Sequence, residues 1–326
     1  MSKIYIVMYH YVRDLGNSRY PSIKGLDYEL FKNQIDYFSN NFHVITMEQV
    51  IDFYRGGYKG KDKKKYFPEH SLLLTFDDGY IDDYTFVLPI LKKYHMQGSF
   101  FVPGKVFTEH CLLDVNKIHF LLAKVPIDIL FNELLKQMDE YRGGQWKYSS
   151  NQELYKMYAL SNRFDDEKTV FFKRILQVGL PERLRNIICT NLYRKYIEVP
   201  EEVLAREIYL SYDQMIFMKQ SGMFFGIHGF EHSWMNRLQE EDLKKDLRKS
   251  LACMRDLIDE NCWVINYPYG SYSREVINSL QDIGCVCGLS TDLGIADLDA
   301  DNRFTLPRLD TNDFPPKSNH YKDFEF

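Results

Sequence analysis

Short apolar runs alternate with amphipathic stretches along most of the chain. The runs predict seven strands, at residues 4–9, 42–45, 72–76, 98–102, 223–227, 264–267 and 285–289. The stretches between them have helical spacing, at residues 28–40, 47–55, 84–94, 240–259 and 274–282, and Thr46 and Ser273 are suitable N-caps for two of them. This alternation predicts an α/β domain, built either as an open doubly wound sheet or as a barrel.

The alternation stops between about residues 105 and 206. Apolar residues there recur at helical spacing, at 119–123, 127–141, 168–178 and 184–196, with no good strand between them. We therefore predict a mostly helical insertion at 106–205 within one α/β domain, which is formed by residues 1–105 and 206–326. Insertions at the strand-end rim of such folds commonly shape access of the substrate.

Composition excludes several classes of protein. The 326 residues are 45% apolar and carry a formal net charge of −5, which suits a globular protein and provides no basic face for nucleic acid. No apolar run approaches the roughly 20 residues of a membrane-spanning helix, and the basic run at 59–65 is expected to be a solvated loop. The first apolar run suits a strand better than a secretion signal, so we expect a cytoplasmic protein.

Two adjacent carboxylates follow the strand predicted at 72–76. Asp77 and Asp78 precede Gly79, which allows a sharp turn, and then Tyr80. Burying two acids there requires compensation, by a cation or a shared proton. A turn with a helix cap is the alternative, because aspartate favours both.

Two imidazoles follow the strand predicted at 223–227. His228 and His232 are four residues apart and can reach one metal ion from a single helical turn, although two separate structural histidines would look the same. The letters His228-x-x-Glu231-His232 also match a zinc-peptidase signature with glutamate as the base. That signature requires a helix through all three residues, which the neighbouring glycines disfavour.

Two further motifs end strands. In Tyr-Pro268-Tyr269-Gly, proline and glycine fix a backbone that can aim an amide at a developing oxyanion, or that simply makes a rigid turn. His10 ends the first strand. Because the carboxyl ends of parallel strands converge on one mouth, we expect all four motifs to meet. One carboxylate and two imidazoles would leave a divalent ion open positions for water and substrate.

The order of these motifs resembles the polysaccharide deacetylases, the carbohydrate esterases that share a NodB-type domain. The shared motifs are Thr-Phe-Asp77-Asp78-Gly, His228-x-x-x-His232 and Tyr-Pro-Tyr269-Gly, and the resemblance covers residues 1–105 and 206–326. It implies a distorted (β/α) barrel of about seven strands. It also implies metal-dependent removal of an N-acetyl group from an amino sugar, with release of acetate.

The resemblance implies roles for the motif residues. Asp77 would be the general base. The metal, Zn²⁺ or another divalent ion such as Co²⁺, Ni²⁺ or Mn²⁺, would be held by Asp78, His228 and His232.

The resemblance also implies a set of substrate-facing residues. The amide of Tyr269 would stabilise the oxyanion, and Pro268 and Tyr80 belong to the same set. Most members of the family carry an arginine that orients the base, where this chain has Asn266. Arg308, in Leu-Pro-Arg-Leu, is the candidate to replace it.

The late Leu-x-x-His motif, which supplies the catalytic acid in the family, is missing near the C-terminus. Val7-Met-Tyr-His10 resembles that motif moved to the front, an order similar to that of the biofilm poly-N-acetylglucosamine deacetylases. We therefore predict that His10 is the general acid that protonates the leaving amine.

The sequence thus predicts a deacetylase of an N-acetylated saccharide, free or linked to a nucleotide or lipid, in the biosynthesis of a surface glycan. Two other hypotheses remain open. One is a glycan-binding module that kept the fold and lost catalysis, suggested by Asn266. The other is the zinc peptidase, which needs Glu231 as its base.

Overall fold

The computed structural model describes residues 2–57, 66–161 and 163–324, so the basic run at 59–65 lies outside it. The chain divides into two compact units. The first comprises Met1–Asp14, Gly25–Cys111 and Arg206–Phe326, and the second comprises Leu15–Lys24 and Leu112–Ala205.

The first unit contains a closed parallel barrel. In the described residues, the ring has the order β1 (Lys3–Tyr9), β11 (Leu306–Asp310), β9 (Cys285–Leu293), β8 (Trp263–Asn266), β7 (Phe224–Ile227), β6 (Gly98–Val102) and β5 (Ser71–Asp77). Strand β5 pairs back with β1, from Tyr5 opposite Leu72 to Tyr9 opposite Phe76. The predicted barrel of about seven strands is therefore confirmed, and the open sheet was the wrong alternative.

The membership of the ring differs from the prediction at one strand. The run at 42–45 contains β4 (His43–Val44), which pairs with the first two residues of β5 and is not part of the ring. Strand β11 takes the seventh place instead. Its Pro307 and Arg308 interrupt the apolar pattern, so the sequence does not mark it as a barrel strand. The short strands β2 (Val12–Arg13), β3 (Leu26–Asp27) and β10 (Ala296–Asp297) also lie outside the ring.

Side chains on the barrel strands alternate between the interior and the outer layer. Phe76 faces outward, where its ring stacks on Tyr9 and on Phe100 with centroids 4.8 Å apart in both pairs. Leu73, on the opposite face of β5, belongs to an apolar cluster with residues of the other strands and of α2 (Met47–Tyr54). Farther along that inward face lies Asp77. The interior is therefore apolar toward the start of β5 and polar at its carboxyl end.

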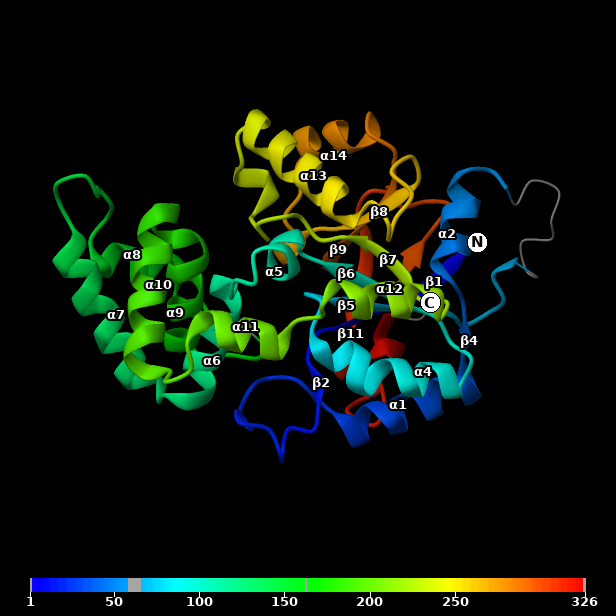
Figure 1. Ribbon diagram of the computed structural model, residues 1–326, viewed down its shortest axis with the longest axis horizontal. Helices are drawn as coiled ribbons and strands as arrows, with labels where there is room; N and C mark the ends of the chain where they lie inside the picture. Colours follow the sequence, from blue (N-terminus) through cyan, green and yellow to red (C-terminus); the bar gives the residue numbers. More distant parts are fainter. Residues whose placement is uncertain (1, 58–65, 162, 325–326) are drawn as a thin grey trace. The chain divides into compact units, whose positions relative to one another are not determined.

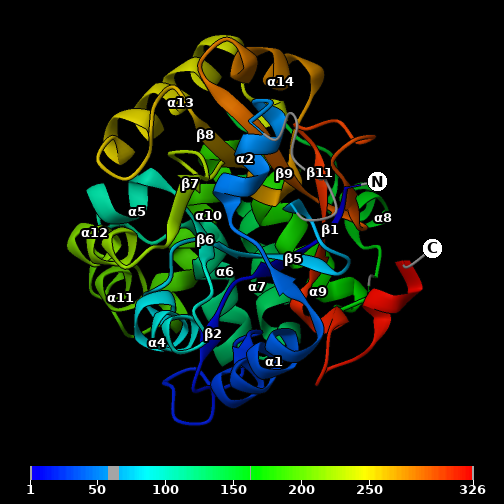
Figure 2. The same ribbon diagram turned by 90° about the vertical axis from the view of Figure 1, so that its right-hand side faces the viewer.

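Helices cover the outside of the barrel. Helices α1 (Tyr28–Asn41) and α4 (Leu88–Lys93) lie side by side on one flank, and α13 (Glu240–Met254) and α14 (Arg274–Gln281) lie on another (Figures 1 and 2). The first unit also contains α5 (Gly104–Thr108), α12 (Tyr212–Gln220) and a π-helical turn, η1 (Asp83–Val87). Thr46 and Ser273 cap α2 and α14, as predicted.

The second unit is built from helices. They are α6 (Asp114–Lys124), α7 (Ile127–Tyr141), α8 (Asn151–Tyr158), α9 (Glu167–Arg174), the π-helical turn η2 (Ile175–Gly179), α10 (Glu182–Tyr196) and the start of α11 (Glu201–Ile208). The segment Leu15–Lys24 belongs to the same unit, and the ring of its Tyr20 packs on Phe120 at 4.6 Å. Across the described ranges, no helix combines the length and apolar character needed to cross a membrane.

Candidate active site

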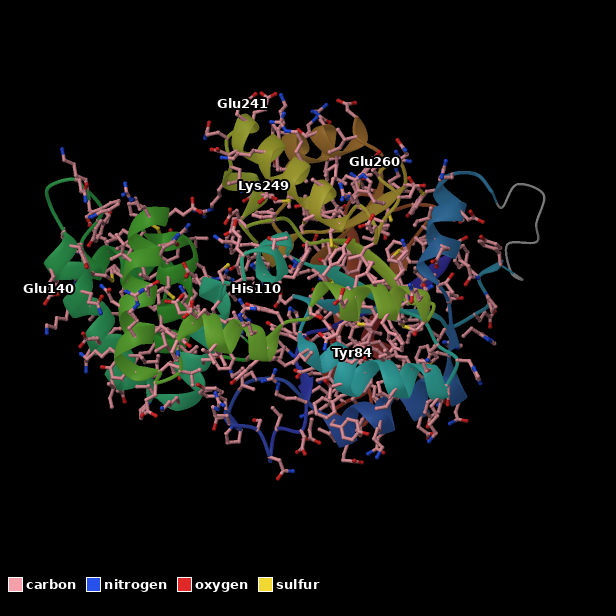
Figure 3. All side chains as sticks on the ribbon, viewed as in Figure 1. Tyr84, His110, Glu140, Glu241, Lys249 and Glu260 are labelled. Carbon is pink, nitrogen blue, oxygen red and sulfur yellow. The ribbon has the colours of Figure 1, made fainter. Side chains whose placement is uncertain are left out.

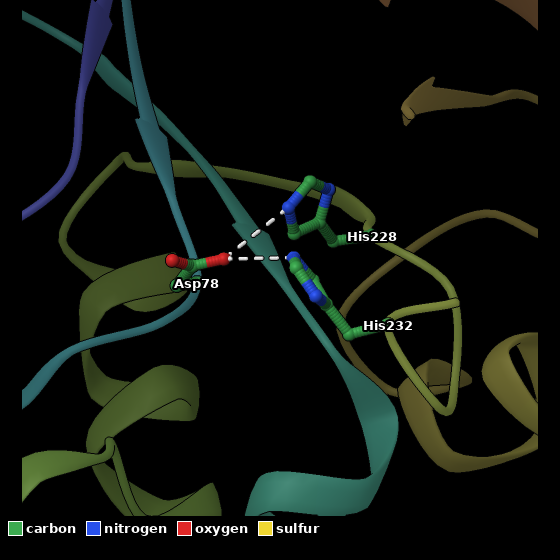
Figure 4. Close-up of side chains that lie close together, drawn as sticks. All are labelled: Asp78, His228 and His232. Carbon is green, nitrogen blue, oxygen red and sulfur yellow. Dashed lines mark ion pairs between the residues drawn. The ribbon is translucent and has the colours of Figure 1, made fainter. Parts of the chain in front are cut away.

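The carboxyl ends of two barrel strands bring one carboxylate and two imidazoles together. Oδ1 of Asp78 lies 3.3 Å from Nε2 of His228 and 3.2 Å from Nε2 of His232 (Figure 4). All three side chains are buried, and their potential ligand atoms lie within 4.8 Å of one another. The structure thus places together the three residues that were predicted to hold a metal.

The backbone at the cluster adopts left-handed conformations that residues other than glycine rarely take. The φ angles are 74° at Asp78, 57° at His232 and 58° at Tyr269. Such conformations tend to gather at functional sites, where the surrounding structure holds them. The turn after β5 also requires Gly79, because its φ is +68° and an added Cβ would lie 2.5 Å from Cγ1 of Val102.

The donor set fits a divalent cation. Nδ1 of His228 donates to the carbonyl oxygen of Asn266 at 2.6 Å, which leaves the lone pair of Nε2 facing Asp78. Burial lowers the pKa of His232 although Asp78 opposes this, so the neutral, metal-binding form is favoured. Oδ1 of Asp78 is buried and has no hydrogen-bond partner in the described part of the chain. Zinc ligands at about 2.0–2.1 Å in a tetrahedron lie about 3.3 Å apart, which matches both measured separations.

The second oxygen of Asp78 is held by a tyrosine. The hydroxyl of Tyr80 donates to Oδ2 of Asp78 at 2.7 Å, and Tyr80 is fully buried with its ring stacked on Tyr11. Burial would raise the pKa of Asp78, but His228 and His232 hold it well below its usual range. The resemblance groups Tyr80 with the substrate-facing residues, whereas the structure places its hydroxyl on the carboxylate of Asp78.

The carboxylate of Asp77 is bound by the guanidinium of Arg308, which comes from β11, two places from β5 in the ring. Nη1 and Nη2 of Arg308 donate to Oδ1 and Oδ2 of Asp77, both at 2.9 Å, and Nε donates to the carbonyl oxygen of Ser290 at 2.8 Å. Asn266 joins this pair, since its amide donates to Asp77 and its oxygen accepts from Arg308 at 3.0 Å. Burial would raise the pKa of Asp77, but Arg308 and then His10 hold it below the usual value. The carboxylate is therefore ionised and fixed in direction.

His10 lies at the rim beside Asp77. Its Nε2 is 3.9 Å from Oδ2 of Asp77, and 43% of its side chain is exposed. Of the predicted site residues, it is the one with an openly accessible imidazole next to the buried acids. A substrate can therefore reach it from solvent.

An aromatic pair borders the cluster. The ring of Tyr269 packs edge-on against His232 at 4.7 Å and stacks on Trp234 at 4.8 Å with an interplanar angle of 10°. Pro268, which precedes Tyr269 in the chain, is buried. The sequence analysis assigned no role to Trp234, although its position two residues after the candidate ligand His232 indicates that it lies near the site.

Glu231 does not join the cluster. Its carboxylate lies 2.6 Å from Nζ of Lys105, and the segment 228–234 contains no helical turn. The helix required by the zinc-peptidase hypothesis is therefore missing, because the segment passes through Gly229 and His232 in left-handed conformations.

Comparisons with known proteins agree with this geometry. A family model described as polysaccharide deacetylase matches residues 64–142 and 188–288, which is more than half of the chain. YxkH of Bacillus subtilis (strain 168), a protein named as a polysaccharide deacetylase, is 31% identical over 104 residues. That match spans 32% of this chain and 33% of YxkH, so the chain covers about a third of that relative's length.

Two solved structures share the fold. The Streptococcus pyogenes deacetylase PplD in complex with acetate superposes with a TM-score of 0.56 at 18% identity, covering 98% of this chain and 96% of PplD. IcaB from Ammonifex degensii superposes with a TM-score of 0.53 at 16% identity, covering 98% and 97%. Together with the family match and the motifs at the mouth of the barrel, this leads to one assignment. The chain belongs to the polysaccharide deacetylase family.

Proposed function

We propose that this protein is a metal-dependent deacetylase that removes N-acetyl groups from an amino sugar in a surface glycan or its precursor. The observation that carries the proposal is the position of Asp77, an ionised carboxylate fixed by Arg308 next to the cluster of Asp78, His228 and His232. Family membership supports the reaction class. PplD was solved with acetate, and acetate is the product of the proposed reaction.

The metal would be held by Asp78, His228 and His232. A divalent ion there, Zn²⁺ or another such as Co²⁺, Ni²⁺ or Mn²⁺, would supply Lewis acidity toward the amide carbonyl and the attacking water. Tyr80 would keep the carboxylate of Asp78 in its orientation through Oδ2. Orienting contacts of this kind are a regular part of metal sites.

The chain's own residues would move two protons. Asp77 would accept a proton from the water while the oxygen of that water bonds to the acyl carbon. The amide of Tyr269 would stabilise the oxyanion. As the bond between carbon and nitrogen breaks, His10 would donate a proton to the leaving amine. Its exposure at the rim and its 3.9 Å separation from Asp77 suit this role.

The hypothesis of a glycan-binding module without catalysis is not needed to explain Asn266. It was suggested by Asn266 at the place of the family's arginine, and Arg308 supplies a guanidinium to Asp77 from β11. The protein would act in the cytoplasm, where its six cysteines would remain reduced. The substrate would be an N-acetylated saccharide, free or linked to a nucleotide or lipid.

The test compares acetate release from N-acetylglucosamine oligomers by the wild-type protein and by Asp77→Asn. We expect chelated wild type to regain turnover with Zn²⁺ or Co²⁺, and Asp77→Asn to lose about 10²–10⁴-fold in kcat while metal analysis shows an unchanged metal content. The exposed Asp282→Asn is the matched control.

Two results would contradict the proposal. Wild-type turnover by Asp77→Asn would overturn the assigned base. Failure of the metal-loaded wild type to release acetate from a panel of N-acetylated saccharides would overturn the reaction itself. Unchanged turnover is expected for Glu231→Gln, since Glu231 pairs with Lys105 and does not join the cluster.

A further inference from the structure

The loop between His228 and His232 is held by one buried carboxylate from a helix outside the barrel. Oδ1 of Asp246, on α13, accepts a hydrogen bond from the amide of Phe230 at 2.8 Å, and Oδ2 accepts one from the amide of Glu231 at 2.9 Å. Asp246 is only 5% exposed. Because its two oxygens bind consecutive amides, the carboxylate fixes the direction of the backbone at the middle of the loop.

The carbonyl side of the same loop is held by backbone donors. The amides of Gly104 and Lys105, in the first turn of α5, donate to the carbonyl oxygens of Gly229 and Phe230, both at 3.0 Å. A second residue of α13 contacts the side chain of the loop residue Phe230, since Nζ of Lys249 lies 4.4 Å from the centre of its ring. Figure 3 labels Lys249 on α13, the helix that also carries Asp246.

The position of Asp246 on α13 is unusual for an acid. The buried face of the helix consists of Leu243, Asp246, Leu247, Ser250 and Met254, a helical stripe in which apolar residues are expected. Burying a carboxylate costs free energy unless hydrogen bonds compensate for the lost water. The two loop amides provide that compensation, so the acid and the loop depend on each other.

The loop between His228 and His232 has no regular secondary structure to fix its conformation. Gly229 and His232 both adopt left-handed conformations, and the segment forms no helix or strand, so its amides need partners from elsewhere. We infer that Asp246 is a positioning residue for the metal site, which sets the spacing of His228 and His232 by binding the loop between them. This inference rests on the metal site of the proposed function.

The test measures metal affinity directly, in the folded full-length protein. Asp246→Asn keeps the volume of the side chain but turns one acceptor into an N–H₂ group facing a backbone N–H, so one of the two hydrogen bonds is lost. We expect the dissociation constant for Zn²⁺, from competition with a chromophoric chelator, to rise about 10-fold or more. The visible spectrum of the Co²⁺-loaded protein should also change. Asp246→Glu keeps both acceptor oxygens and should recover part of the affinity, and it carries the test if Asp246→Asn does not fold.

Two controls separate positioning from stability. Asp242→Asn changes an exposed acid one turn earlier on α13, and Leu243→Ala removes a buried side chain from the same stripe. Leu243→Ala should lower the melting temperature and leave the Zn²⁺ dissociation constant unchanged. A purely structural role for Asp246 predicts the same pattern for Asp246→Asn.

The outcomes also separate the inference from the proposed function. If wild type binds one Zn²⁺ and loses it in His228→Ala, while Asp246→Asn stays within twofold of wild type in affinity with an unaltered Co²⁺ spectrum, only the role of Asp246 is overturned. If wild type does not bind Zn²⁺, or binds it equally in His228→Ala, the metal site is overturned and the role of Asp246 with it.

Discussion

Four aspartates lie at the end of β5 or shortly after it, and the structure compensates their burial to different extents. Asp77 pairs with a guanidinium and Asp78 faces two imidazoles. Asp82 pairs with Arg13 at 2.8 Å, yet burial still raises its pKa to about 6. Asp83 is fully buried, and neither of its carboxylate oxygens has a hydrogen-bond partner in the described ranges. Burial, reinforced by the neighbouring aspartates, raises the pKa of Asp83 well above its ordinary value of 3.8.

Asp83→Asn should therefore stabilise the protein at neutral pH. The unfolded chain ionises Asp83 near pH 3.8, whereas the folded chain holds the proton to much higher pH, so stability is lost as pH rises between these two values. Asparagine does not titrate, and the gain should be small below pH 4 and on the order of 1 kcal/mol or more at pH 7. Urea unfolding from pH 4 to pH 8 measures it, with Asp282→Asn as the exposed control. A gain that does not change with pH would contradict this account.

Arg308 offers a test of the contact with Asp77. Arg308→Met would leave a buried carboxylate without its cation, which should cost about 3–5 kcal/mol of folding free energy and should lower kcat. Arg308→Lys keeps the charge but loses the two-pronged contact, so both losses should be smaller. The exposed Arg303→Met should behave as wild type in unfolding and acetate-release assays. Equal kcat in Arg308→Met and wild type would show that the guanidinium is not needed.

The sequence predicts the candidate metal ligands better than it predicts the residues that hold those ligands in position. Asp78, His228 and His232 could be found because each follows an apolar run and parallel strands end at one mouth. The acid of α13 could not be assigned, because Asp246 stands in a run of charged residues that resembles a solvated helix face. Its only signal is its place on the apolar stripe, and its partners lie in another element.

At the scale of elements, the turn after β5 is a tightly constrained connection near the site. Gly79 needs both a left-handed φ and the space beside Val102, so local propensity and tertiary packing impose the same residue. The helix caps were predictable from local propensity alone, since the side chains of Thr46 and Ser273 accept hydrogen bonds from the first turn of their own helices. Strand β11 was not predictable, because Pro307 and Arg308 interrupt its apolar pattern, and the groups that accept from Arg308, Asp77 and Ser290, lie on other strands.

Substitution of two glycines separates these effects. Gly144 has a φ of +55° with open space around its Cβ position, so Gly144→Ala should cost only about 1–2 kcal/mol for the left-handed backbone. Gly79→Ala adds a collision with Val102, and overpacking should add about 1–3 kcal/mol. Because Asp78 precedes this turn, Gly79→Ala should also weaken Zn²⁺ binding, whereas Gly144→Ala should not. Equal unfolding free energies and equal Zn²⁺ affinities for the two variants would contradict this view.

At the scale of the whole molecule, the metal is expected to contribute to folding stability. The cluster brings a partnerless carboxylate oxygen and two imidazoles into a buried site of the first unit, an arrangement that the unfolded chain lacks. A ligand that binds only the folded state stabilises it, by about 2.7 kcal/mol at a free concentration 100 times its dissociation constant.

Removal of the metal should therefore lower the melting temperature. We expect EDTA to destabilise wild type and added Zn²⁺ to restore it, as measured by calorimetry. His228→Ala should not respond to either treatment. The wild-type protein must first be shown to contain metal. If EDTA then leaves its melting temperature unchanged, the metal does not contribute to folding stability.

The ring closes between strands from opposite ends of the sequence. Strand β1 leads into His10 and β11 carries Arg308, and the two strands pair directly, with Val7 opposite Leu309. During synthesis, Asp77 leaves the ribosome more than 200 residues before Arg308, the residue whose guanidinium binds it. A translation product that stops short of residue 308 would lack both the closing strand and the counter-charge of Asp77. Incomplete chains would therefore lack the paired carboxylate on which the proposed reaction depends.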